Sequence, residues 1–149
     1  METNQINSNH EKGKTGELRV AEAITKYGFK VVHVGGATMY AQEGLRYFVF
    51  DLLPYGKGKS FWIQVKNKEP RNAYPDTGLE KWRWEKMKAL TRESGMPMML
   101  LFTDDSEKIY GDWISNLKEE VHGGEWNSKT NTEMIYFWLK DMKKLEDLL

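Results

Sequence analysis

The chain contains no cysteine in its 149 residues. It can therefore form neither a disulfide framework nor a thiolate metal site, and a reducing, cytoplasmic setting is expected. No apolar run approaches the roughly 18 residues of a membrane-spanning helix, so no membrane segment is expected. Residues 1–10 are polar and lack the apolar stretch of a signal peptide. These absences argue against secreted scaffolds and membrane proteins.

The chain also lacks net charge, because 22 lysines and arginines balance 22 aspartates and glutamates. A non-specific nucleic-acid coat protein would be strongly basic, so this total argues against one. The charges are unevenly distributed, however, with ten basic and four acidic residues over 57–92, and six basic and twelve acidic residues over 93–149. The central basic block predicts a phosphate-binding surface whose affinity falls with salt. A solvated helix face is the alternative interpretation for 81–92.

The residues that are present indicate one folded domain. A hydrophobic content of 40% with 13% aromatic residues excludes a disordered chain. A chain of this length buries enough surface to hold a core without disulfides. We expect residues 1–11 to form a flexible tail and residues 12–149 to form a single domain.

Sequence periodicity predicts a mixed α/β domain whose sheet is built partly from a hairpin. Thr15 is a suitable N-cap for the first helix, and Gly28 and Gly95 are typical residues at helix C-termini. Pro54 is expected to stop the second strand, and the glycines within 55–59 to connect it to the third. The predicted elements are a helix over 14–27, strands over 29–34, 46–53 and 60–66, a helix over 79–94, strands over 97–103, 108–114 and 133–138, and a short helix over 140–149.

Polar side chains gather around the third predicted strand. Alternation places Gln64 and Lys66 on one face of that strand. Asp51 ends an apolar strand, where an aspartate is unusual, and the hairpin brings it beside the third strand. Glu17 lies on the apolar stripe of the first helix, where a carboxylate is costly unless it is paired or bound to a cation. We therefore expect one polar cluster at this point of the fold.

This combination of two carboxylates, an amide oxygen and a lysine suits a Mg²⁺ site. Mg²⁺ prefers hard oxygen ligands and shares its coordination with substrate phosphate, so Glu17, Asp51 and Gln64 are its predicted ligands. Lys66 would orient the attacking water or offset the developing charge. Simpler interpretations exist for three of them: Lys66 as a solvated strand-end lysine, Asp51 as a turn cap and Glu17 as a complement to the helix dipole.

The same residues carry a resemblance to a known family. Glu17 in a first helix, Asp51 at a strand end and the run Gln64-Val65-Lys66 after a glycine-containing hairpin are similar to the motif of the PD-(D/E)XK nuclease superfamily. With the segment 13–17 and the small size, the pattern most resembles the archaeal Holliday-junction-resolvase-like and phage nuclease branches. The resemblance covers roughly residues 12–103. It implies a restriction-endonuclease-like αβββαβ core with a mixed central sheet flanked by helices, followed here by a C-terminal β/βα extension.

The resemblance implies a Mg²⁺-dependent deoxyribonuclease, with Mn²⁺ as a substitute ion, that hydrolyses phosphodiester bonds in branched, Holliday-junction-like or phage-replication DNA. By this resemblance, Glu17, Asp51 and Gln64 hold the metal and Lys66 is the catalytic lysine. Two positions differ from the family pattern: Phe50 stands where a proline is usual, and Gln64 stands where an acid is usual. The second difference leaves open a nuclease-like fold that binds nucleic acid or a protein partner without cutting. A small adaptor with an acidic docking region is a third interpretation.

DNA contacts are predicted for basic residues around the proposed site, including the loop 67–78. Trp82 and Trp84 are interpreted as packing and surface anchors in preference to base-stacking platforms. Many small relatives are two-fold dimers, so the resemblance also allows a homodimer. The strand 135–138 with the C-terminal leucines is then either its interface or a core edge. The residues predicted to contact DNA are Lys14, Lys57, Lys59, Lys68, Arg71, Lys81 and Arg83.

Overall fold

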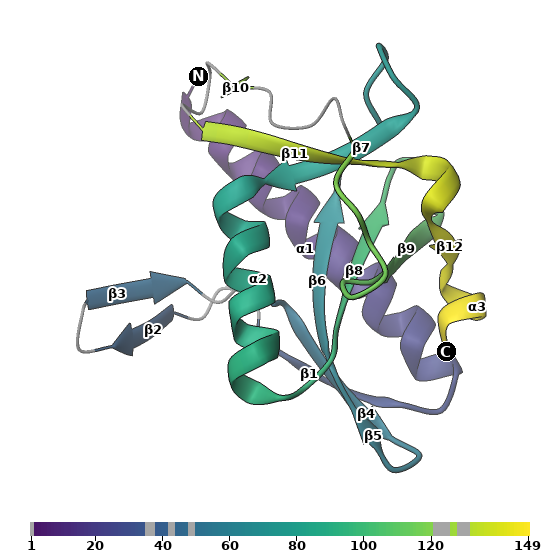
Figure 1. The fold of residues 1–149 in the computed structure, drawn as a ribbon. Helices are drawn as coiled ribbons and strands as arrows, with labels where there is room; N and C mark the ends of the chain where they lie inside the picture. Colours follow the sequence, from purple (N-terminus) through teal and green to yellow (C-terminus); the bar gives the residue numbers. More distant parts are fainter. Residues whose placement is uncertain (1, 35–37, 42–43, 48–49, 121–125, 128–131) are drawn as a thin grey trace.

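A mixed sheet of seven strands forms the centre of the molecule (Figure 1). The computed structural model describes residues 2–34, 38–41, 44–47, 50–120, 126–127 and 132–149. The strand order is β1-β4-β6-β8-β9-β12, with β5 beside β4, and β6 and β8 run parallel. The strands are β1 (Lys30–His33), β4 (Leu52–Gly56), β5 (Lys59–Ser60), β6 (Trp62–Asn67), β8 (Met98–Thr103), β9 (Ile109–Trp113) and β12 (Lys143–Lys144).

Helices cover both faces of this sheet. α1 (Glu2–Lys26) lies across one face and α2 (Lys81–Ser94) lies on the other (Figure 1). Ile63 and Val65 of β6 belong to the hydrophobic cluster under α1, whereas Trp62 packs against the cluster under α2. The predicted alternation along β6 is therefore confirmed, and it separates two hydrophobic clusters. Within the described residues, no helix is both long and apolar enough to cross a membrane.

The predicted order of the core elements is confirmed. α1, β1, β4, β6, α2 and β8 supply the αβββαβ succession, and α2 is the crossover that allows β6 and β8 to be parallel. Gly95 ends α2 as predicted: its backbone is left-handed (φ 69°) and its N–H donates to the Thr91 carbonyl at 3.0 Å. Every residue of β8 is buried, as expected for a strand covered on both faces.

Two smaller sheets lie outside the central one. β7 pairs with β11, although the sequence predicts a loop and a helix start there. The prediction misses this strand because its pairing partner lies far along the chain, with Glu80 paired to Met134. Gly78 permits this close pairing, since a Cβ there would lie 1.9 Å from the Ile135 carbonyl oxygen. The additional strands are β2 (Thr38–Ala41), which pairs with β3 (Gly44–Tyr47), and β7 (Asp76–Glu80), which joins β11 (Thr132–Trp138) and β10 (Trp126–Asn127).

The start of the first helix differs from the prediction. α1 begins at Glu2 rather than near residue 14, so residues assigned to a tail are helical. Thr15 is not an N-cap, because its Oγ1 donates to the Glu11 carbonyl one turn back at 2.9 Å. The segment before Gly13 contains neither proline nor glycine, so nothing in it interrupts the helix.

The predicted strand over 46–53 is wrong as one element. Its first residues belong to β3 and its last to β4, and residues 48–49 lie outside the described part of the chain. β4 also continues through Pro54 instead of stopping there. The Pro54 carbonyl accepts the Phe61 N–H at 3.3 Å, so this residue keeps a strand hydrogen bond although proline has no N–H to donate.

The predicted helix over 140–149 is shorter than expected. The segment forms a 3-10 turn (η1, Leu139–Asp141), then β12 at the edge of β9, then α3 (Leu145–Leu148). Leu145 is buried against α1, and Ile135 and Phe137 are buried under α2. The aromatic strand and the C-terminal leucines therefore belong to the core, which was one of their two predicted roles.

A buried ion cluster ties β7 to its surroundings. Arg71 Nε donates to Asp76 Oδ1 at 2.6 Å, Arg71 Nη2 donates to Glu120 Oε1 at 3.1 Å, and the guanidinium lies 3.4 Å from the centre of the Tyr136 ring. Burial, with Asp76 beside it, raises the pKa of Glu120 to about 7. Burial alone would raise the pKa of Asp76, but Arg71 brings it below its ordinary value. Arg71, predicted to contact DNA, is thus engaged in the fold.

We predict that the free energy of unfolding falls as the pH rises through 7, because Glu120 then loses its proton in the folded state. Glu120 has an ordinary pKa of 4.5 but keeps its proton in the fold until about pH 7. The folded state therefore binds more protons over this interval, and the free energy of unfolding falls with rising pH. Glu120→Gln imitates the protonated side chain, so urea denaturation should show a smaller loss between about pH 5 and 8.5, by on the order of 1 kcal/mol.

The exposed neighbour Glu119 provides the control for this experiment. Glu119→Gln should follow the pH dependence of the parent, because it removes the same charge from the chain and leaves the contacts of Arg71 with Asp76 and Glu120 in place. A Glu120→Gln variant that loses as much stability as the parent would contradict the prediction.

Candidate active site

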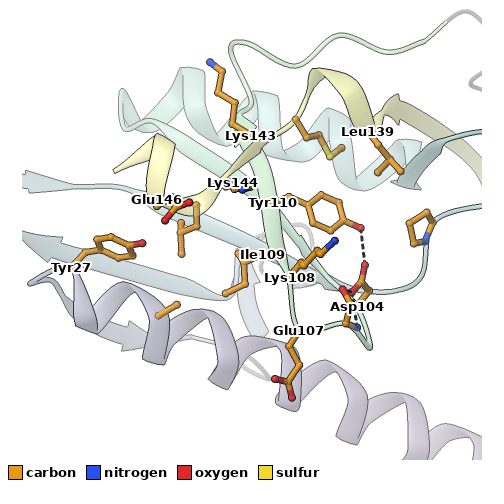
Figure 2. Close-up of a pocket in the computed structure, with 15 residues that line it drawn as sticks. Tyr27, Asp104, Glu107, Lys108, Ile109, Tyr110, Leu139, Lys143, Lys144 and Glu146 are labelled. Carbon is orange, nitrogen blue, oxygen red and sulfur yellow. Dashed lines mark hydrogen bonds between the residues drawn. The ribbon is translucent and has the colours of Figure 1, made fainter.

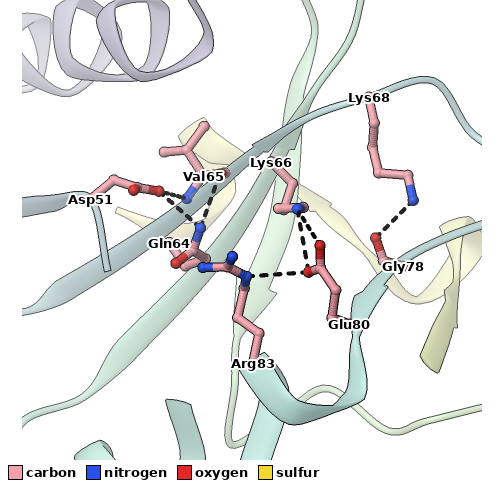
Figure 3. Close-up of polar contacts among 8 residues, drawn as sticks. All are labelled: Asp51, Gln64, Val65, Lys66, Lys68, Gly78, Glu80 and Arg83. Atoms are coloured by element: carbon pink, nitrogen blue, oxygen red, sulfur yellow. Dashed lines mark hydrogen bonds and ion pairs between the residues drawn. The ribbon is translucent and has the colours of Figure 1, made fainter. Parts of the chain in front are cut away.

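The site is built where β4 separates from β6. The two strands share the register pair Leu52↔Ile63, and beyond it a side chain replaces the strand partner. Asp51 Oδ2 accepts the Val65 backbone N–H at 2.8 Å and Gln64 Nε2 at 2.9 Å (Figure 3). A carboxylate thus completes the hydrogen bonding of the strand, and Asp51 lies beside Gln64, as predicted.

Gln64 is almost fully buried, with 3% of its surface exposed. Its amide nitrogen also donates to the Val65 carbonyl at 3.2 Å. Its oxygen Oε1 is buried and, like Asn67 Oδ1, Thr77 Oγ1 and Glu120 Oε2, has no hydrogen-bond partner among the described residues. Such an acceptor is uncommon, since leaving it unsatisfied costs about 1–3 kcal/mol. Oε1 is therefore available as a ligand atom.

α1 brings Glu17 to Asp51. The helix closely approaches the end of β6 at Gly16, where a Cβ would lie 2.8 Å from Asn67 Cβ. Asn67 Nδ2 fixes this approach by donating to the Lys12 carbonyl at 2.7 Å. Burial raises the pKa of Glu17 to about 7, and the neighbouring Asp51 carboxyl adds to the effect. Burial also raises the pKa of Asp51, so two carboxyls that resist ionisation lie together.

Lys66 is held by the carboxylate of Glu80, which ends β7 in the three-stranded sheet. Its Nζ lies 3.4 Å from both oxygens of Glu80, and Arg83 Nε donates to Glu80 Oε2 at 3.2 Å (Figure 3). Burial lowers the pKa of Lys66, and Glu80 opposes this effect. Burial would raise the pKa of Glu80, but Lys66 and Arg83 bring it below its ordinary value. These side chains are 22–24% exposed, so solvent reaches the cluster.

Sequence reasoning missed Glu80 as a site residue and gave Arg83 only a DNA contact. Glu80 ends β7, and that strand exists because of a partner far along the chain. At the start of a predicted helix, an acid has a sufficient local explanation in the helix dipole. No local signal therefore marks Glu80 as a partner of Lys66.

Three of the predicted DNA-contact residues lie at the site. Arg83 belongs to the cluster just described. Lys14 lies on α1 near Glu17, and its charge lowers the pKa of that carboxyl against the larger effect of burial. Burial lowers the pKa of Lys68, and the nearby charge of Lys66 lowers it further. Lys14 therefore acts on Glu17 and Arg83 acts on Asp51, whereas Lys68 adds its charge beside Lys66.

The other predicted DNA-contact residues are placed differently. Lys57 and Lys59 lie at the turn between β4 and β5, at the end of the hairpin away from the site (Figure 1). Lys81 pairs with Glu133 at 3.4 Å, and both side chains are partly exposed. Arg71 lies in the buried cluster of β7. The basic surface around the site is therefore smaller than the basic block in the sequence.

The donor set fits a hard divalent cation. Among the residues that the structure describes, no three His, Cys, Asp or Glu side chains form a metal-binding group. Glu17 and Asp51 nevertheless supply two adjacent carboxyls with raised pKa values, and Gln64 Oε1 supplies a buried oxygen without a partner. A cation between them would stabilise the ionised carboxyls and satisfy the amide oxygen. Two protein carboxylates with water completing the shell is a usual environment for Mg²⁺.

A separate pocket lies between α1, β9 and the C-terminal segment (Figure 2). The Tyr110 hydroxyl donates to Asp104 Oδ2 at its edge, at 3.5 Å, and burial raises the pKa of this phenol. The three lysines that line the pocket, Lys108, Lys143 and Lys144, are matched by three acids, Asp104, Glu107 and Glu146. The pocket therefore presents no excess of one charge, and it contains none of the predicted catalytic residues.

No protein-family model matches this chain, and no curated protein matches it. Among solved structures, the chain is similar to Hjc, a Holliday junction resolvase from the archaeal hyperthermophile Archaeoglobus fulgidus. The two share 12% sequence identity with a TM-score of 0.63, and the match covers 91% of this chain and 93% of that chain. The chain thus has a restriction-endonuclease-like fold, which is the fold that the sequence resemblance implied.

We predict opposite effects of alanine at two glycines of α1. Gly16→Ala places a Cβ 2.8 Å from Asn67 Cβ, so the helix must shift and the free energy of unfolding should fall by about 1–3 kcal/mol. Gly13→Ala meets nothing within 4 Å and should raise it by about 0.5–1 kcal/mol, because alanine favours helix. Urea denaturation measures both. Equal stability of the two variants would show that the helix does not depend on this close approach.

Proposed function

We propose that the protein is a metal-dependent endonuclease that hydrolyses phosphodiester bonds in DNA. One observation carries this proposal: Asp51 lies beside the Glu17 carboxyl, the Gln64 amide and the charge of Lys66, and Gln64 Oε1 has no partner among the described residues. These residues come from segments far apart in the sequence. That they meet at one point of a nuclease-like fold favours a catalytic role for them. In the structural cluster around β7, by contrast, Arg71 directly contacts both carboxyls.

Each residue has a defined role in this proposal. Glu17, Asp51 and Gln64 Oε1 hold Mg²⁺ or Mn²⁺, which when bound lowers the pKa of water and neutralises charge on a phosphate. Lys66 presents its ammonium to the attacking water or to the phosphate oxygens. Glu80 keeps that ammonium in position and favours its charged form against the effect of burial.

Branched DNA is the substrate class that we favour. The likeness to a Holliday junction resolvase is the first reason. The second is the limited basic surface: Lys14, Lys68 and Arg83 lie at the site, so contacts are concentrated near the cleaved phosphate rather than spread along a long duplex. A homodimer would supply the second site that is needed to cut both strands.

We predict that DNA cleavage requires Mg²⁺ or Mn²⁺ and is lost in Asp51→Asn and Lys66→Met. Each substitution should lower the cleavage rate at least about 100-fold, because it removes a ligand charge or the cation at the reacting phosphate. Asparagine at 51 keeps an oxygen that can accept the Val65 N–H, so the fold should be preserved. The measurement is a time course on labelled linear, flapped and four-way DNA, with Mg²⁺, Mn²⁺ or EDTA.

Lys59→Met is the matched control, because Lys59 lies at the distant hairpin turn and should leave cleavage close to the parent rate. Circular dichroism checks that all variants are folded. Parent-like cleavage by both site variants would overturn the assignment of the residues. A parent protein that binds these DNA structures and cuts none of them would overturn the proposed activity.

A DNA-binding protein that does not cut is the second candidate, and Gln64 is the observation that favours it. An amide brings no negative charge to the metal, whereas a carboxylate at the same position would. In the metal-free fold, however, that carboxylate would face Asp51, because Gln64 Nε2 donates to Asp51 at 2.9 Å. The residue at this position therefore affects both metal affinity and metal-free stability.

We predict that Gln64→Glu is less stable than the parent by about 1–3 kcal/mol without metal, because two like charges meet at the site. Mg²⁺ should raise the melting temperature of this variant more than that of the parent. If Mg²⁺ raised the melting temperature of both proteins equally, residue 64 would not be a metal ligand. Cleavage that appears in Gln64→Glu alone would favour the non-cutting candidate, and cleavage by the parent would exclude it.

A further inference from the structure

Trp82 and Trp84 lie two residues apart on α2 and have different surroundings. Trp84 is 3% exposed and packs against Phe137, with ring centres 5.0 Å apart. Its predicted packing role is confirmed. Trp82 is 40% exposed, although an indole is among the side chains that gain most from burial. Core packing therefore does not account for Trp82.

A short series of contacts connects Trp82 to the candidate active site. The Arg83 guanidinium lies over the Trp82 ring, 4.6 Å from its centre. Arg83 Nε donates to Glu80 at 3.2 Å, and Glu80 lies 3.4 Å from Lys66 Nζ. The exposed indole is thus adjacent to the groups that would contact the cleaved phosphate. The cation over its ring also restrains its orientation.

An exposed indole beside a phosphate-binding cluster suits a nucleobase. Stacking of a base on an aromatic side chain is strong and tolerates any sequence, because every base has a π-face. A base inside a duplex is already stacked on both sides, so it reaches such a ring only where pairing is interrupted. Arg83, which lies over the ring, can at the same time contact the backbone phosphate.

We infer that Trp82 stacks on an unpaired base next to the phosphate that is cleaved, so that DNA with interrupted pairing binds in preference to continuous duplex. This inference rests on the proposed function, because it takes the cluster of Lys66, Glu80 and Arg83 as the phosphate site. It adds that the site selects DNA with an unpaired base. Phosphate contacts alone provide no such selection, because every duplex carries them.

The test measures binding without cleavage. Fluorescence anisotropy in EDTA compares a blunt labelled duplex with the same duplex carrying a single-stranded flap, for the parent, Trp82→Ala, Trp82→Phe and Tyr55→Ala. We expect the parent to bind the flapped DNA roughly tenfold more tightly than the duplex, as one stacked base implies. Trp82→Ala should abolish this preference and leave duplex affinity within about twofold, and Trp82→Phe should keep most of it.

Tyr55 is the matched control, because it is an exposed aromatic residue (44%) on the distant hairpin, and its replacement should change neither affinity. The preference should also persist as salt is raised, because stacking is less sensitive to salt than phosphate contacts are. Equal weakening of both DNA forms in Trp82→Ala would overturn the inference, as would no weakening of either. A parent that shows the Trp82-dependent preference but never cuts would overturn the proposed activity and leave the stacking site standing.

Discussion

The candidate site depends on one hydrogen bond from the backbone to a side chain. β4 leaves β6 after the pair Leu52↔Ile63, and Asp51 Oδ2 then accepts the Val65 N–H that a strand carbonyl would otherwise bind. A buried carboxylate is costly, but here its oxygen also satisfies a buried backbone donor. The same contact fixes Asp51 against Gln64, so the geometry of the sheet and the geometry of the site have a common origin.

Charge at the site is divided into two neighbouring parts. On one side, Glu17 and Asp51 place two carboxyls together, and burial raises the pKa of each. On the other side, Lys66 and Arg83 share Glu80. The zero net charge of the chain therefore conceals a local separation. The basic block of the sequence overstates the basic surface, because part of it lies inside the fold and part lies on a remote hairpin.

Local patterns predicted the residues whose elements are defined locally. Alternation along one strand placed Gln64 and Lys66 together, and an apolar run ending in an acid marked Asp51. Glu80 was not predictable in this way, because β7 owes its strand conformation to pairing with β11, far along the chain. The shortened C-terminal helix has the same cause, since β12 pairs with the edge of β9. Non-local pairing, rather than weak propensity, limited the prediction.

The glutamine at position 64 stabilises the site in the absence of a metal ion, because its amide donates to Asp51. A carboxylate there would repel Asp51, whereas the amide of Gln64 donates to it and holds it beside β6. The amide orientation that makes this bond leaves Oε1 buried without a partner. Leaving this acceptor unsatisfied costs less than placing two carboxylates face to face. Under the proposed function, glutamine therefore favours a site that is formed before the cation binds, whereas a carboxylate at position 64 would need the cation to offset its repulsion with Asp51.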